Sequence, residues 1–132
     1  MDIKLAVGDP KAKKVYKRDV KEDDAKSLFG KRIGDKFNGE LIGLSGYEFL
    51  ITGGSDFCGF PMRKDVVGIA RKKVLITPGT IGTRHSRAGI RRRRTVCGNQ
   101  VYAKTAQLNL KILKHGSESL APVAAETEKK AE

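Results

Sequence analysis

The stretch AQLNLKILK, residues 106–114, carries the clearest β-strand pattern in the chain. Leu108, Leu110 and Ile112 alternate with polar residues, which is the period of two expected when one face of a strand packs on a core. The same alternation occurs near the N-terminus in DIKLAV, residues 2–7. The sequence therefore predicts two half-buried strands far apart in the chain.

Between these two segments the pattern predicts more strands and little helix. KEDDAKSLFG (residues 21–30) has early acids and a final glycine, which is typical of one short helix. Glycine and proline predict loops at 53–62 and 79–89. We expect further strands at 13–20, at 35–44 and 46–54 around an Asn38-Gly39 turn, at 71–77, and at 93–103 with a Cys97–Gln100 turn inside it.

Short strands at close spacing with glycine-rich turns favour a mainly β fold. We expect a small barrel-like or strongly curled antiparallel sheet, with one short helix, an arginine-rich loop and a disordered C-terminal tail. The predicted domain spans residues 1–115. The Ala/Glu-rich residues 116–132 contain few large apolar side chains, so we expect them to be disordered.

Positive charge is concentrated in one part of the sequence. The 132 residues carry a net charge of +12. Residues 62–94, here called the basic segment, hold 11 Lys or Arg and one acid, a net of +10, whereas residues 1–61 have a net of only +1. Uniform basicity would indicate solubility, but a single concentrated region indicates a footprint for nucleic acid.

Several protein classes do not fit this composition. No apolar run approaches the roughly 18 residues of a membrane span, and we expect no secretory signal, because the first ten residues show no charged region followed by an apolar stretch. The two cysteines in a lysine-rich chain favour free thiols and a cytoplasmic protein. The chain has no Trp and few aromatic residues, which argues against a stacking platform for single-stranded nucleic acid.

Four consecutive arginines lie inside GIRRRRTVCGN, residues 89–99. The flanking glycines, threonine and valine favour an extended conformation. In a strand, Arg91 and Arg93 would point to one side, about 6.6 Å apart, and Arg92 and Arg94 to the other. One strand could then touch two phosphate backbones. The alternative is a solvated charge run or a localisation-type patch.

Other basic residues near this run favour contact with RNA or DNA. Arginine suits this role because its planar fork binds phosphate with two hydrogen bonds. If about six charges met phosphates, log affinity should fall with log salt at a slope of about −4 to −5.

The residues 79–95 have few apolar side chains that could pack on a core, so we expect them to be disordered without RNA. The predicted RNA contacts are Arg63, Lys64, Arg71, Lys72, Lys73, Arg84, His85, Arg87, Arg91, Arg92, Arg93 and Arg94.

No active site or cofactor site is evident in the sequence. Asp56 and Asp65 are too sparse for a two-metal nuclease. A zinc site would need closely spaced ligand pairs, and no CxxC or HxxxH pair exists. We therefore expect no catalytic residue, no cofactor and no metal from the possible zinc-ligand set Cys58, His85, Cys97 and His115.

ITGGSDFCGFPM, residues 51–62, closely resembles the signature of the small-subunit ribosomal protein six family of eukaryotes and archaea. RRRRTVCGN and AQLNLKILKHG follow in the family's order, so the resemblance covers about residues 1–116. The residues that fill the signature are Gly53, Gly54, Asp56, Gly59, Pro61 and Met62.

The resemblance implies a structural constituent of the small ribosomal subunit that binds ribosomal RNA, has neighbouring ribosomal proteins as partners, and has no enzymatic activity. It implies no membrane partner, no small-molecule substrate and a β-rich, barrel-like domain. Asp56 would bond local amides in a turn.

Eukaryotic members continue into a basic C-terminal helix with kinase-target serines. Ser117 and Ser119 lack such a basic context, so phosphorylation control is not carried over to this chain, which resembles the short archaeal form.

Two rival functions remain open. A free-standing nucleic-acid binder, such as an RNA chaperone or a chromatin protein, would share the charge but would not need the 51–62 signature. An RNA-processing enzyme would need converging acids or a metal cluster in the basic half of the chain.

Overall fold

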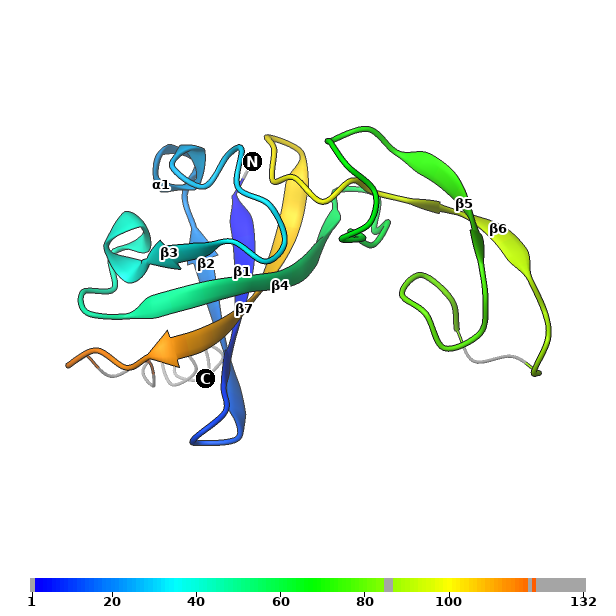
Figure 1. Cartoon of the computed structure of the whole chain (residues 1–132). Coiled ribbons are helices and arrows are strands. Elements are labelled where there is room, and N and C mark those ends of the chain that lie inside the picture. The colour runs from blue at the N-terminus through cyan, green and yellow to red at the C-terminus, as the bar shows by residue number, and fades with distance from the viewer. Residues whose placement is uncertain (1, 85–86, 119, 121–132) are drawn as a thin grey trace, which may run out of the picture.

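The computed structural model describes residues 2–84, 87–118 and 120. These residues form mainly strands, with one short α-helix and one 3-10 helix, η1 (Figure 1). The elements in chain order are β1 (Ile3–Asp9), β2 (Lys14–Val20), α1 (Glu22–Lys26), β3 (Lys36–Asn38), η1 (Gly39–Ile42), β4 (Glu48–Asp56), β5 (Lys72–Ile76), β6 (Arg92–Val96) and β7 (Thr105–Lys114).

Five strands form one mixed sheet in the order β2-β1-β7-β4-β3. The centre of this sheet is β7, the strand with the clearest sequence pattern. It pairs in parallel with β1, where Leu5 lies opposite Leu108, and antiparallel with β4, where Ile51 lies opposite Leu110. The first and the last strand of the described chain therefore lie side by side at the middle of the sheet.

One face of the sheet carries the main hydrophobic core. Leu5 and Leu108 are buried there with Phe49, whose ring lies 5.7 Å from the ring of Tyr47. Residues around α1 and η1, such as Leu28, complete this cluster. The other face is polar, as the alternation of buried and exposed residues in β1 and β7 requires.

Strands β5 and β6 form a separate two-stranded sheet, here called the arginine ribbon. Figure 1 shows the ribbon extending sideways from the five-stranded sheet. It has its own small cluster of buried side chains, made by Val66, Ile76 and Val96 with Val74 packed against them.

The predicted barrel-like or strongly curled antiparallel sheet is wrong. The five-stranded sheet is open, with β2 and β3 at its two edges, and the β1–β7 pair is parallel. The physical reason is visible in the pairing. Strands β5 and β6, which could have extended the sheet toward closure, pair with each other and leave it.

Three local predictions also need correction. Only Lys36–Asn38 of the expected 35–44 strand is extended, because Leu44 donates to the Gly39 carbonyl at 2.8 Å and closes a tight helical turn. The expected 53–62 loop begins as strand, since β4 continues to Asp56. The expected 93–103 hairpin ends at Val96, because Asn99 instead bonds backbone atoms of the 64–68 segment.

The helix expected at 21–30 is present but ends at Lys26. The described part of the expected 79–89 loop contains turns and no strand or helix. The disordered tail was expected over 116–132, and residues 119 and 121–132 of it lie outside the described residues. The domain boundary at residue 115 stays a prediction.

Candidate nucleic-acid interface

The signature residues 51–62 form the end of β4 and the turn that follows it. Gly54 is required by close packing, since a Cβ atom there would lie 2.3 Å from the backbone oxygen of Gln107 in β7. The chain then reverses, and the amide of Met62 donates back to the Gly54 carbonyl at 2.9 Å. The two ends of the turn are thus joined across its base.

Asp56 holds this turn together. Its carboxylate is only 2% exposed and accepts from four donors. Oδ1 accepts from the amides of Cys58 and Phe60 at 2.9 and 3.0 Å. Oδ2 accepts from Nε of Arg71 at 2.6 Å and from Sγ of Cys97 at 3.1 Å. One side chain therefore fixes the turn and links it to two later parts of the chain.

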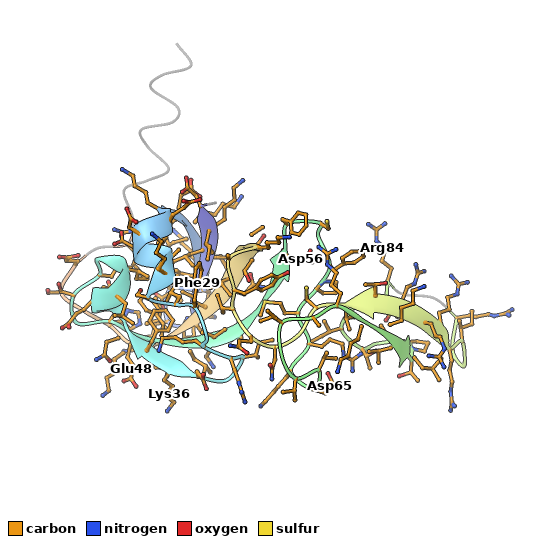
Figure 2. All side chains as sticks on the ribbon, turned by 90° about the horizontal axis from the view of Figure 1, so that it is seen from above. Phe29, Lys36, Glu48, Asp56, Asp65 and Arg84 are labelled. Atoms are coloured by element: carbon orange, nitrogen blue, oxygen red, sulfur yellow. The ribbon has the colours of Figure 1, made fainter. Side chains whose placement is uncertain are left out.

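The turn also anchors both ends of the basic segment. At its beginning, Met62 forms a bridge with Cys97, and the amide of Cys97 donates to the Pro61 carbonyl at 2.8 Å. The guanidinium of Arg71 lies 4.8 Å from the ring centre of Phe57 and 5.0 Å from that of Phe60. Figure 2 shows Asp56 where the sheet meets the ribbon.

These contacts change the titration of the groups involved. Burial acts to raise the pKa of Asp56, but hydrogen bonds from Cys97, Arg71 and two amides outweigh burial and leave that pKa below its usual value. The hydrogen bond to Asp56 raises the pKa of Arg71. Burial, together with the neighbouring carboxylate, raises the pKa of the Cys97 thiol to about 11. The Asp56–Arg71 contact is thus an ion pair at neutral pH.

The arginine ribbon presents basic side chains on both faces. Residues opposite each other in an antiparallel pair share a face. Ile76 lies opposite Arg92 and Val74 opposite Arg94, so these two arginines share the face of the small buried cluster. Leu75 lies opposite Arg93, which therefore points to the other face.

The basic residues differ in their partners. Arg63 donates to both carboxylate oxygens of Asp65, at 2.9 and 2.7 Å, and Arg71 is paired with Asp56. His85 lies outside the described residues. Within the described part of the chain, the remaining predicted contacts are exposed and make no ion pair with a carboxylate, namely Lys64, Lys72, Lys73, Arg84, Arg87, Arg91, Arg92, Arg93 and Arg94.

A second basic feature was missed by the count over residues 1–61. The hairpin of β1 and β2 contains KAKKVYKR, residues 11–18, with five Lys or Arg and no acid. The acids of α1 cancel this charge in a long window but lie elsewhere in space. Figure 1 shows the hairpin tip pointing away from the sheet in a different direction from the ribbon. A count over eight residues would have found it.

The residues that the structure describes contain no group of three or more His, Cys, Asp or Glu that could hold a metal ion. None of their helices is long and apolar enough to cross a membrane. Cys58 and Cys97 are both free thiols, the first exposed and the second buried.

Comparisons with known proteins agree with the signature. The family model of ribosomal protein S6e matches residues 3–125. The chain is 42% identical over 132 residues to small ribosomal subunit protein eS6 of Methanosphaera stadtmanae, covering 100% of this chain and 99% of that protein. It is 41% identical over 129 residues to eS6 of Methanocella arvoryzae, covering 98% and 90%. Identity to eS6 of Haloarcula marismortui is 39% over 120 residues, covering 91% and 92%. The chain belongs to the ribosomal protein S6e family.

Proposed function

We propose that this protein is a structural constituent of the small ribosomal subunit and binds ribosomal RNA through the basic segment. Its relatives are named as small-subunit proteins, and ribosomal proteins of this family are not enzymes. The proposal also places the protein in the cytoplasm, on the ribosome, with other ribosomal proteins as neighbours.

The observation that carries the RNA-binding part is the arginine ribbon. It holds exposed arginines on both faces, and the Asp56 turn joins its base to the five-stranded sheet. A two-faced basic ribbon can lie between two RNA segments, with one phosphate backbone on each side. RNA segments packed closely repel each other, and guanidinium groups between them remove that repulsion.

In this arrangement the two sheets have different tasks. The five-stranded sheet supplies the stable core, because it holds nearly all of the large buried side chains. The ribbon has only a small cluster of its own, so its position depends on the anchor at Asp56, Met62 and Cys97. In this proposal the five-stranded sheet positions the arginine ribbon for contact with RNA.

The test is sedimentation of a native cell extract on a gradient, with the protein followed across the fractions at rising salt. We expect the wild-type protein to run with the small subunit. A variant with Arg91, Arg92, Arg93 and Arg94 all changed to Gln should be released at lower salt. The matched control removes four charges from the other basic feature, by changing Lys11, Lys13, Lys14 and Lys17 to Gln.

Each outcome has a definite meaning. Release of the arginine variant alone supports binding through the ribbon. Release of the control alone would move the RNA contact to the β1–β2 hairpin. A wild-type protein that stays at the top of the gradient would contradict the ribosomal role and favour a free-standing nucleic-acid binder.

A further inference from the structure

A cleft of about 280 Å³ lies on the face of the arginine ribbon that carries Arg92 and Arg94. Its apolar floor is formed by Ile76, Pro78 and Ile90, of which the half-buried Pro78 and Ile90 offer surface to a ligand, because Ile76 is only 1% exposed. Its rim is strongly basic. The residues that line it are Ile76, Pro78, Gly82, Thr83, Arg84, Ile90, Arg92 and Arg94.

The wall of this cleft is held by local contacts. Gly82 has a φ of +100° and lies so close to the floor that a Cβ atom there would be 3.2 Å from Ile76 and 3.3 Å from Val96. The hydroxyl of Thr80 donates to the Thr77 carbonyl at 2.7 Å, and that of Thr83 to the Thr80 carbonyl at 3.0 Å. These contacts give the wall of the cleft its shape in the structure.

The residues that line the cleft indicate which chemical groups a ligand must carry. Arg84, Arg92 and Arg94 make no ion pair with a carboxylate in the described part of the chain, so the rim offers three unneutralised guanidinium groups. A phosphate alone would not need an apolar floor, and a continuous duplex presents no flat group that could enter a cleft. A flat ring joined to a phosphate fits both parts.

We propose that this cleft receives one unpaired nucleotide of an RNA chain, with its base on the apolar floor and its flanking phosphates on the three arginines. The volume is close to the lower end of small-ligand sites, about 300 Å³, which suits a single base. The inference rests on the proposed RNA binding and adds to it the form of RNA that is recognised. The ribbon would bind paired RNA by charge and an unpaired nucleotide by shape.

The ribbon provides a matched control for this inference. Lys73 lies opposite Thr95 and Leu75 opposite Arg93, so Lys73 and Arg93 share the face that has no cleft. Substituting Lys73 and Arg93 lowers the net charge of the ribbon by two, which is the same change as substituting Arg92 and Arg94. Both double variants remove two positive charges, from opposite faces of the ribbon, and the control removes one lysine and one arginine instead of two arginines.

The experiment measures the affinity of the full chain for two labelled RNA duplexes that differ by one unpaired nucleotide. We expect the wild type to bind the duplex with the unpaired nucleotide about tenfold more tightly, because the base buries apolar surface against the floor. With Arg92→Gln and Arg94→Gln together, this preference should fall close to one. With Lys73→Gln and Arg93→Gln together, both affinities should fall while the preference stays.

A third variant tests the floor without changing charge. Ile90→Ser should lower affinity for the duplex with the unpaired nucleotide about fivefold and leave the paired duplex unchanged. Circular dichroism of each variant verifies that the sheets are formed.

An equal preference in both double variants, or no preference in the wild type, would overturn the cleft assignment and leave the proposed function standing. Wild-type protein that binds neither RNA would instead count against the proposed function itself.

Discussion

At the scale of single residues, Asp56 shows how one carboxylate can hold a turn and a ribbon in place. Its four donors come from Cys58, Phe60, Arg71 and Cys97, so that three segments meet at one side chain. From the sequence, only the bonds of this acid to local amides in a turn could be expected. The distant partners Arg71 and Cys97 become visible only when the chain is folded.

Changing Asp56 to Asn should therefore destabilise the fold. The amide keeps one acceptor oxygen but loses the charge facing Arg71, and we expect a loss of about 1–3 kcal/mol in the free energy of unfolding. The cost stays moderate because the Arg71 side chain is 33% exposed and can regain water. Urea denaturation measures this loss in the free energy of unfolding.

The matched control is Asp65→Asn, which breaks an ion pair whose acid is 61% exposed and should lower the free energy of unfolding by less than about 1 kcal/mol. Equal losses in both variants would contradict the role assigned to Asp56.

The same carboxylate predicts how stability changes with pH. Burial opposes ionisation of Asp56, but its hydrogen bonds lower the folded-state pKa below the ordinary value of 3.8. A lowered folded pKa gives stability that is complete above the unfolded pKa and is lost as pH falls through the folded pKa. Between about pH 5 and pH 2, the wild type should lose stability more steeply than Asp56→Asn. Urea denaturation across this range measures both slopes, and parallel curves would refute the prediction.

At the scale of the elements, two neighbouring glycines in β4 have opposite requirements. A Cβ at Gly54 would meet the Gln107 backbone at 2.3 Å, whereas a Cβ at Gly53 would meet nothing within 4 Å. Gly54→Ala should therefore force β4 away from β7 and cost about 1–3 kcal/mol in the free energy of unfolding. Gly53→Ala should change it by less than about 0.5 kcal/mol. Thermal unfolding of the two variants compares them directly, and a larger loss from Gly53→Ala would show that the β4–β7 packing is misassigned.

The elements also show how far the sequence could predict the fold. Alternation predicts β1 and β7 correctly, because each buries one face on the same core. It could not predict that they pair in parallel, since partners so far apart in sequence carry no local signal. The prediction of a barrel-like sheet was wrong for the same reason. The residues of β5 do not indicate that its partner is β6 instead of the edge of the five-stranded sheet.

The candidate site, too, could be predicted only in part from the sequence. Charge counting finds the basic segment, because composition is independent of folding. It cannot tell a free charge from a paired one. Arg63 and Arg71 count equally with Arg93 in the sequence, yet in the fold each of the first two faces its own carboxylate. The cleft beside Arg84 is likewise a product of the 78–84 turns and has no motif.

At the scale of the whole molecule, the protein combines a stable sheet with a projecting ribbon. Figure 2 shows side chains spread along the ribbon, with Arg84 labelled over it and Asp56 at its junction with the sheet. A ribbon that stands out from its core can contact a partner on both faces. The small cluster of Val66, Ile76 and Val96 is enough to hold two strands only because the ribbon base is fixed to the sheet.

This arrangement predicts which charges control the salt dependence of RNA binding. Each phosphate contact contributes about 0.7–0.9 to the slope of log affinity against log salt. Arg93→Gln removes an exposed arginine with no carboxylate partner among the described residues, so the slope should become shallower by about one. Arg63→Gln removes a charge that Asp65 already neutralises, so the slope should change much less. Filter binding to one RNA across a salt series measures both slopes. Because both substitutions remove one positive charge, a binding mode that depended on net charge alone would change the two slopes equally, and that result would contradict recognition by the ribbon.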